Sequence, residues 1–374
     1  MKKISKRLTS LELQGYKSIA YDAPLRLKFG SVNILLGANG AGKSNVVSFF
    51  KMLEQMARGS FQRFVAESGT NQIFLHYGAK KTPAISAAIC FEGELGYEVY
   101  SFQLTSAVPD RLIISLEMIE WADYDSQKAD LNHKVLISDF NESALISATD
   151  DLEKEMHNLI AGCKVYQFSD SSATSPMRLA STVESAHYLQ SEANNLSSFL
   201  YYLKRNYSES YNRIVSYVRE VVPQFKDFYL EPSGEYIALK WEDTSPNDYV
   251  LSAHQLSDGS IRFIALATLL LQPEQTMPRV IIIDEPELGL HPYAIDRLTE
   301  MIKDASLHSQ VIVATQSPAL IDGFSPDDVT IIEYDAYKQS TIARKLNSTD
   351  YKEWLDEYTL SELWDKNIIG GRPI

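Results

Sequence analysis

One glycine-rich stretch constrains the fold of this chain more than any other segment. Residues 37–44 read Gly-Ala-Asn-Gly-Ala-Gly-Lys-Ser, which fits the pattern G-x-x-x-x-G-K-[S/T] of a phosphate-binding loop. The apolar run Val32 to Leu36 before it predicts a buried strand, and a helix is expected after it. Glycines allow such a backbone to turn its N–H groups towards phosphate oxygens, because no Cβ obstructs them. The sequence therefore predicts that the chain binds a nucleoside triphosphate.

The residues of this phosphate loop have separate expected roles. Lys43 is expected to place its positive charge on the β- and γ-phosphates, and the Ser44 hydroxyl is expected to ligate Mg²⁺ at the start of the helix. The residues expected to contact the nucleotide are Gly37, Ala38, Asn39, Gly40, Ala41, Gly42, Lys43, Ser44 and Asn45. The loop alone does not say which kind of nucleotide hydrolase this is.

Length and composition limit the class of protein. The chain has 374 residues, of which 45% are hydrophobic, enough for one large domain or two lobes. Its two cysteines, Cys90 and Cys163, are too few for a disulfide framework or a zinc site. No run approaches the roughly 20 apolar residues that a membrane span requires. We expect a cytoplasmic protein without a membrane segment.

The charge balance bears on nucleic acid. The formal net charge is −14, whereas affinity for phosphate backbones comes mainly from clustered Lys and Arg. Any contact with DNA is therefore expected to be local. The candidate basic positions are Lys51, Arg58, Arg63, Lys80, Lys81, Lys204 and Arg205.

Periodicity predicts an α/β protein with a mixed sheet, an antiparallel meander and an inserted helical lobe. Strands are expected at 8–19, 25–29 and 32–36, and the meander at 84–91, 97–104 and 112–118. Apolar residues spaced i, i+3, i+4 and i+7 from Leu196 and from Ile214 predict two amphipathic helices. The expected divisions are an ATPase lobe over 1–120, the helical lobe over 121–245, and 246–374 completing the first lobe.

A second motif supplies carboxylates. Residues 279–286 read Arg-Val-Ile-Ile-Ile-Asp-Glu-Pro, a buried strand that ends in two acids. A Mg²⁺-dependent hydrolase needs such acids at the carboxyl end of a central strand. Asp284 is expected to hold the metal through water, and Glu285 to act as the general base on the attacking water.

A third motif resembles a known family. Residues 255–260 read Gln-Leu-Ser-Asp-Gly-Ser, and their LSDG resembles the signature of ABC-type ATPases. That resemblance implies that Ser257 and Gly259 act in trans, on the γ-phosphate of ATP held by the phosphate loop of a second copy. An ordinary helix N-cap at Ser257 is the alternative, and both can hold for the same residue.

Three further segments resemble RecF-like and OLD-like ATPases, which are related to SMC proteins. These segments are EPELGLHP at 285–292, QVIVATQSP at 310–318, and the C-terminal stretch from Trp354 through Gly370-Gly371-Arg372-Pro373. The resemblance implies an ABC-type head that binds ATP and Mg²⁺. It also implies a homodimer or higher assembly, and a partner effector such as a Toprim-type nuclease in bacterial anti-phage defence. A RecF-like DNA-binding repair or replication factor and a nucleotide-gated scaffold that sequesters a toxin remain alternatives; a transporter ATPase is disfavoured by the GLHP and TQSP forms.

Several positions follow from the resemblance by place in the chain. Gln316 stands where most ABC proteins have a histidine, and its amide can donate to the γ-phosphate but cannot titrate, so slow, switch-like hydrolysis is expected. Lys17 lies where relatives carry a basic residue near the phosphates. Gln72 and His76 are the best positions for the glutamine loop that would sense Mg²⁺.

Spacing separates the chain from two relatives. About 210 residues lie between the phosphate loop and the signature, without sustained heptads, so no long coiled coil is expected. No acidic cluster with nuclease spacing follows Asp284, so we expect no nuclease domain in this chain.

Overall fold

The computed structural model describes residues 6–124, 131–137, 139–245 and 249–372, which fall into two compact units. Unit 1 comprises Met1–Val165 and Ser325–Ile374, and unit 2 comprises Tyr166–Phe324. Residues 125–130 of the expected helical lobe, and Pro373 of the C-terminal motif, lie outside the described residues.

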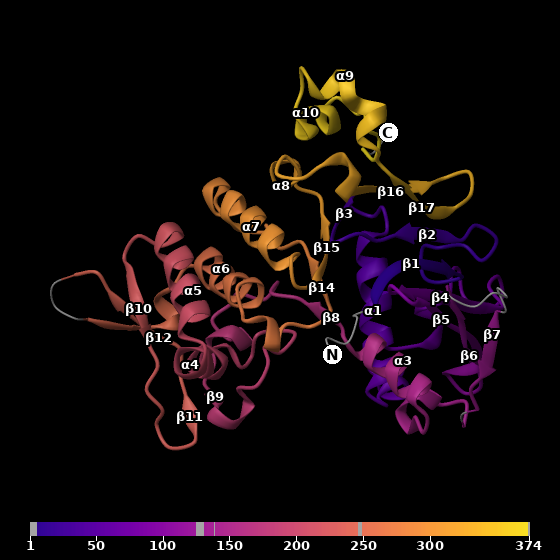
Figure 1. Ribbon diagram of the computed structural model, residues 1–374, viewed down its shortest axis with the longest axis horizontal. Helices are drawn as coiled ribbons and strands as arrows, with labels where there is room; N and C mark the ends of the chain where they lie inside the picture. The colour runs from indigo at the N-terminus through magenta and orange to yellow at the C-terminus, as the bar shows by residue number, and fades with distance from the viewer. Residues whose placement is uncertain (1–5, 125–130, 138, 246–248, 373–374) are drawn as a thin grey trace. The chain divides into compact units, whose positions relative to one another are not determined.

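Unit 1 contains the predicted meander. Its antiparallel sheet has the order β2-β1-β4-β5-β6-β7. The strands are β1 (Arg7–Gln14), β2 (Leu25–Lys28), β4 (Ala84–Glu92), β5 (Gly96–Ala107), β6 (Arg111–Asp123) and β7 (Asn132–Val135). Buried and less buried side chains alternate along β5, as expected for a strand with one face on a core. Figure 1 shows this sheet beside α1 (Lys43–Ala57).

A second group of strands in unit 1 carries the phosphate loop. The fully buried β3 (Val32–Leu36) pairs in parallel with β16 (Val329–Asp335), which pairs antiparallel with β17 (Ser340–Lys345). The phosphate loop follows β3, and α1 follows the loop. On α1, the Phe49 ring stacks on Phe102 of the meander with centroids 6.2 Å apart, so the helix is anchored in the core.

Unit 1 also contains several shorter helices, and the residues of one of them, α3 (Asp151–Ala161), fall in the range expected for the helical lobe. The others are α2 (Phe61–Glu67), α9 (Lys352–Leu355) and α10 (Leu360–Asp365). α3 contacts α1, and the His157 ring bonds the Ala57 carbonyl at 2.9 Å. The expected lobe over 121–245 is therefore divided, because the apolar side of α3 is buried in unit 1. β8 (Cys163–Tyr166) lies at the junction of the two ranges.

Unit 2 combines helices with a parallel pair of strands and two small sheets. Its helices α4 (Leu196–Asn206), α5 (Ser208–Val221), α6 (Asp258–Leu270) and α7 (Pro292–Ala305) pack on one another, and α8 (Pro318–Ile321) is a single turn. β14 (Val280–Asp284) and β15 (Gln310–Thr315) pair in parallel. The predicted helices at Leu196 and Ile214 are present as α4 and α5.

Unit 2 also holds small sheets that the sequence analysis did not predict. β10 (Phe225–Tyr229), β12 (Lys240–Asp243) and β13 (Val250–Ser252) form an antiparallel sheet, and β9 (Ser181–Thr182) pairs with β11 (Tyr236–Ile237). Among the described residues, no helix combines the length and apolar character that crossing a bilayer demands.

Candidate functional site

The phosphate loop has the backbone conformation that its sequence predicts. Gly40 and Gly42 have φ angles of 80° and 110°, which L side chains rarely adopt. The amides of Asn45 and Val46 both donate to the Gly42 carbonyl, at 3.1 and 3.3 Å, and α1 begins at Lys43. The loop thus leads directly into a helix N-terminus, where backbone N–H groups and the helix dipole favour an anion.

The side chains of Lys43 and Ser44 lie in the first turn of α1. Lys43 is only 4% exposed, and its ammonium donates to the carbonyls of Gly37 and Ala38 at 2.8 and 3.0 Å. Its charge is therefore held inside the curve of the loop. Ser44 is exposed in the first turn of α1, and the side-chain amide of Asn45 donates from Nδ2 to the Ser18 hydroxyl at 2.6 Å.

Lys17 lies against the same helix. Its ammonium donates to the Ser48 hydroxyl, one turn after Ser44, at 2.9 Å. Burial lowers the pKa of Lys17, so an added negative charge nearby would be stabilising. The Lys17 carbonyl bonds Nδ1 of His76 at 2.8 Å. The structure therefore brings the lysine to the phosphate-loop helix.

Gln72 is hydrogen-bonded through both groups of its side-chain amide. Its Oε1 accepts from the Ala79 amide at 2.8 Å, and its Nε2 donates to the Asn71 side chain at 2.7 Å. Both partners of the Gln72 side chain lie within residues 71–79. The role of Gln72 as a metal-sensing glutamine stays a prediction.

The C-terminal motif lies against the phosphate loop in unit 1. The Ala38 amide donates to the Gly371 carbonyl at 3.3 Å, and the Gly371 amide donates to Glu333 on β16. Residues 38–41 line a cavity of about 700 Å³ together with 333–337, Ile342, Gly371 and Arg372. The sequence identified this motif but gave no indication of where it packs.

In unit 2, the two predicted carboxylates lie at the end of β14. Asp284 pairs in register with Ala314 of β15, and the Glu285 amide donates to the Ala314 carbonyl at 2.8 Å. Glu285 has a φ of 46°, which is uncommon for a residue with a side chain. Both acids are half-buried. They stand at the carboxyl end of parallel strands, the edge at which open α/β sheets bind ligands.

The loop that follows β15, Gln316 and Ser317, is named the switch loop, and it leaves the strand at the same edge as the carboxylates. The Thr315 hydroxyl donates to Glu287 Oε1 at 2.6 Å and accepts from the Ser317 amide at 2.9 Å. Gln316 lies between these anchors and is half-buried. The strand register therefore brings Gln316 to the same edge of unit 2 as Glu285.

The signature motif begins α6. Ser257 is the N-cap, and its hydroxyl accepts from the Ser260 amide at 3.1 Å, while the residue itself is exposed. A Cβ on Gly259 would lie 2.4 Å from the Gly289 carbonyl oxygen. Only glycine fits there, so the signature packs tightly on the turn after β14. The N-cap reading of Ser257 is correct, and its exposure leaves the role in trans open.

Comparison with known proteins places the chain in a family. A family model described as "AAA domain, putative AbiEii toxin, Type IV TA system" matches residues 32–322. The chain belongs to this AAA-domain family. A search of curated proteins finds no match.

Solved SMC heads share the fold of this AAA-domain protein. An SMC head domain with an extended coiled coil bound to the C-terminal domain of ScpA, from Pyrococcus furiosus, is 15% identical with a TM-score of 0.60, over 94% of this chain and 99% of that chain. An SMC head bound to the C-terminal winged-helix domain of ScpA is 16% identical with a TM-score of 0.59, over 93% and 99%. The SMC head domain of Thermotoga maritima is 14% identical with a TM-score of 0.51, over 91% and 99%.

These similarities confirm the predicted fold class, an α/β ABC-type ATPase head. They concern the fold alone, because the identities are low. Among the described residues the longest helix is α1, with 15 residues, so this AAA-domain protein carries no long coiled coil in that part of the chain.

Two buried arginines of the AAA-domain protein hydrogen-bond the backbone around the signature, and neither was predicted from the sequence. Arg178 donates to the carbonyls of Ala253 and Leu256 and pairs with Asp258 at 2.9 Å. Arg262 donates to the carbonyls of Phe168, Ser169 and Leu288. Arg262 could have been noticed as the one charge in the apolar run 261–271. Arg178 gave no local signal.

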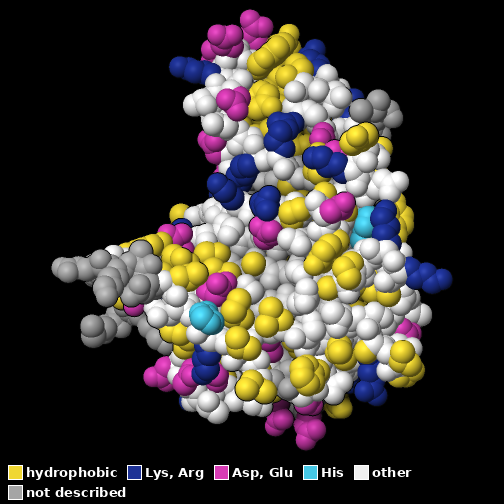
Figure 2. Space-filling view, turned by 90° about the vertical axis from the view of Figure 1, so that its right-hand side faces the viewer, with side chains coloured by type: hydrophobic (Ala, Val, Ile, Leu, Met, Phe, Trp, Pro, Cys, Tyr) yellow, Lys and Arg dark blue, Asp and Glu magenta, His cyan; other side chains and the backbone are white. Residues whose placement is uncertain are grey.

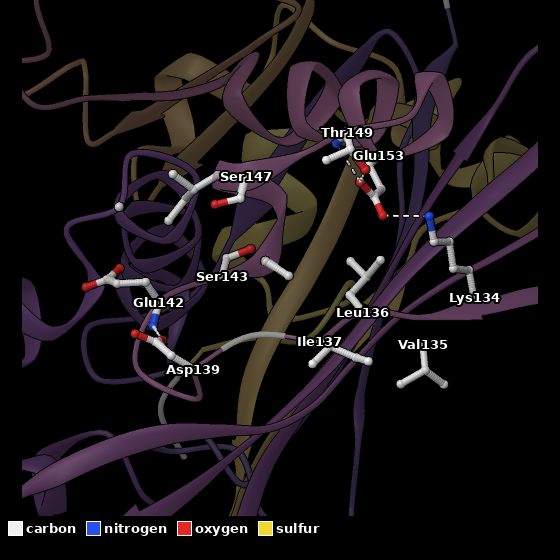
Figure 3. A pocket seen from close by; sticks show the side chains of 13 residues that line it. Lys134, Val135, Leu136, Ile137, Asp139, Glu142, Ser143, Ser147, Thr149 and Glu153 are labelled. Atoms are coloured by element: carbon white, nitrogen blue, oxygen red, sulfur yellow. Dashed lines mark hydrogen bonds and ion pairs between the residues drawn. The ribbon is translucent and has the colours of Figure 1, made fainter.

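Another cavity in unit 1 does not suit a nucleotide. It measures about 750 Å³ and lies beside β7 and the start of α3 (Figure 3). Its lining combines apolar side chains such as Ile137 with the carboxyls of Asp139, Glu142 and Glu153, and Lys134 is paired with Glu153 at 2.6 Å. These acids would repel phosphate groups. The phosphate loop therefore remains the candidate nucleotide site of this AAA-domain protein.

Proposed function

We propose that this protein binds and hydrolyses ATP with Mg²⁺, and that two copies close around the nucleotide. The observation that supports this most directly is the phosphate loop, in which the buried Lys43 ammonium faces the carbonyls of a glycine cradle at the N-terminus of α1. Membership of the AAA-domain family is consistent with it. In this proposal residues 37–45 hold the phosphates, and Lys17 adds a second positive charge.

The proposed chemistry assigns one task to each polar group. Glu285 accepts a proton from the attacking water, and Gln316 donates its amide to the γ-phosphate. Ser44 and Asp284 offer a hydroxyl and a carboxylate, the hard oxygen donors that Mg²⁺ prefers. When bound, Mg²⁺ neutralises charge on the β- and γ-phosphates. Because Gln316 cannot titrate, turnover is expected to be slow, which suits a switch.

The composite site is proposed to form in trans. Ser257 is exposed at the N-terminus of α6, and its hydroxyl and the adjacent helix N–H groups can donate to an anion. A phosphate loop completed by the signature of another copy gives two equivalent sites by two-fold symmetry. ATP then acts as the bridge between copies.

Mixing two inactive variants tests the composite site. We expect Lys43→Ala and Ser257→Arg each to lose ATPase activity. The first removes the positive charge that is proposed to bind the phosphates, and the second places a large side chain where the signature would contact the γ-phosphate. In an equimolar mixture about half of the dimers are mixed, and each mixed dimer has one intact site, so about a quarter of the wild-type rate should return. Phosphate release measures the rate.

The control for this experiment is subunit exchange. Differently tagged copies that co-purify after mixing with ATP demonstrate mixed dimers. Subunit exchange without recovery of ATPase activity would contradict a site completed in trans. Wild-type ATPase activity of the Ser257→Arg variant by itself would show that the signature is not needed for hydrolysis.

The proposed biological role is to gate an effector protein in bacterial anti-phage defence, in the cytoplasm. This role follows from the resemblance to RecF-like and OLD-like ATPases, and a Toprim-type nuclease on another polypeptide is the effector we favour. The alternative form of this role is a scaffold that binds ATP, hydrolyses it little and keeps a toxin sequestered. These roles are tested by expressing this protein together with the products of its neighbouring genes and measuring phage plating. Reduced plating would support a defence role, and unchanged plating would contradict it.

A DNA-binding repair or replication factor is the second candidate. Figure 2 shows Lys and Arg side chains grouped over the upper half of one face. Lys81 and Lys338 are exposed, and so is Tyr337, which directly precedes Lys338 and is 97% exposed. With a net charge of −14, we expect only weak duplex binding at about 0.15 M salt. Fluorescence anisotropy over a salt series measures it, and strong, salt-dependent affinity would favour the DNA-binding role.

A further inference from the structure

Glu287 is a buried carboxyl that none of the roles above uses. It lies in the turn after β14 and is 7% exposed. Its Oε1 accepts from the Thr315 hydroxyl at 2.6 Å, at the end of the neighbouring strand β15. Thr315 is fully buried. This contact joins the turn that carries Glu285 to the loop that carries Gln316.

The contact fixes the backbone of the switch loop. The Gln316 amide also bonds the Glu287 carboxyl, and the Ser317 amide donates to the Thr315 hydroxyl at 2.9 Å. On the other side, the Leu290 amide donates to the Glu287 carbonyl at 3.0 Å. Two consecutive amides of the switch loop therefore depend on Glu287, one directly and one through Thr315.

The environment of the carboxyl favours its neutral form. Burial raises the pKa of Glu287, and the nearby charge of Glu285 acts in the same direction. Within the described chain, no hydrogen-bond partner reaches Oε2 of Glu287. Burying a carboxyl with one oxygen that accepts no hydrogen bond costs free energy, so we expect Glu287 to have a structural or functional role.

Glu285 needs external support for its backbone. Its φ of 46° is held by the bond from its amide to the Ala314 carbonyl at 2.8 Å and by the bond from the Leu288 amide to its carbonyl at 3.3 Å. Ala314 directly precedes Thr315. A displacement of the switch loop would therefore also disturb the backbone of Glu285.

We propose that Glu287 is a positioning residue that locks Gln316 and Glu285 into one arrangement through its bond to Thr315. This inference rests on the proposed ATP hydrolysis. Glu287 itself touches no reacting atom. It makes the switch loop and the general base move as one element, so that a change in one is transmitted to the other.

A double-mutant cycle tests this arrangement. Thr315→Val removes the hydroxyl at constant size, and Glu287→Ala removes the carboxyl. Each is expected to lower kcat about tenfold while changing KM less than about threefold. A tenfold loss corresponds to the free energy of about one hydrogen bond, here the bond between Thr315 and Glu287 that positions the catalytic groups. The double variant should also lose about tenfold rather than about a hundredfold, because both changes break the same contact.

Conservative variants separate positioning from simple folding defects. Thr315→Ser keeps the hydroxyl and Glu287→Gln keeps an acceptor oxygen, so both should retain kcat within about twofold of wild type. Multiplicative losses in the double variant, or a rise in KM at unchanged kcat, would overturn the proposal. Failure of Thr315→Ser to rescue would do the same.

A readout without turnover keeps this test separate from the proposed function. Hydrogen exchange of the Gln316 and Ser317 amides should rise about tenfold in Glu287→Ala and Thr315→Val and stay unchanged in Thr315→Ser. Unchanged exchange in all variants would overturn the positioning role. Wild-type protein without ATPase activity would refute the proposed function alone, since the exchange measurement does not depend on hydrolysis.

Discussion

Replacing Glu285 with glutamine should abolish ATP turnover and leave ATP binding intact. The glutamine amide has the size of the carboxylate, so the turn after β14, in which Glu285 already has a φ of 46°, should keep its shape. The amide cannot accept a proton from water, and loss of a general base costs about a hundredfold or more in kcat. Single-turnover phosphate release and ATP titration measure the two properties. ATP affinity should change less than about threefold.

The trapped state gives this prediction a second readout. If ATP bridges two copies, Glu285→Gln should accumulate as an ATP-bound dimer, seen by light scattering after gel filtration. Glu287→Gln is the matched control, because the same change two residues later leaves the proposed base in place and should keep turnover. Phosphate release from Glu285→Gln at the wild-type rate would remove Glu285 from the role of base.

Local patterns were sufficient to predict the local structure that carries the candidate site residues. The run 32–36 is buried on every side chain as β3, and Gly40 and Gly42 after it have the positive φ values that are typical of glycine. Ser257 caps α6, as a serine before an apolar helix should. In each case the residues that determine the structure are neighbours in sequence, so their spacing carries the information.

Contacts between distant residues were not predictable in the same way. Residues 151–161 fall in the range expected for the helical lobe, but they form α3, which packs in unit 1. The periodicity of α3 shows only that the helix has an apolar face. Arg178 braces residues 253–258 from about 75 positions away. The bond between Glu287 and Thr315 depends on the parallel register of β14 and β15, which no single segment encodes.

Gly42→Ala should remove ATP binding. The φ of Gly42 is 110°, and a Cβ there would lie 2.2 Å from Oγ1 and 2.8 Å from Cγ2 of Thr341, which is fully buried. Thr341 cannot turn aside freely, since its hydroxyl donates to the Ala41 carbonyl at 2.9 Å and contacts the Ser18 hydroxyl at 2.7 Å. Relief of the clash must therefore displace the loop at the residue before Lys43. Isothermal titration should show ATP affinity reduced about a hundredfold or more.

Gly40→Ala is the matched control, because it adds the same methyl group two residues earlier. Gly40 also has a positive φ, of 80°, but a Cβ there meets no atom within 4 Å. It should therefore cost only the backbone strain of about 1 kcal/mol, a loss of about fivefold in affinity. Equal losses in the two variants would show that strain, and not the contact of Gly42 with Thr341, determines the effect. A larger loss at Gly42 alone would show that β17, which carries Thr341, helps to set the shape of the phosphate loop from the far end of the chain.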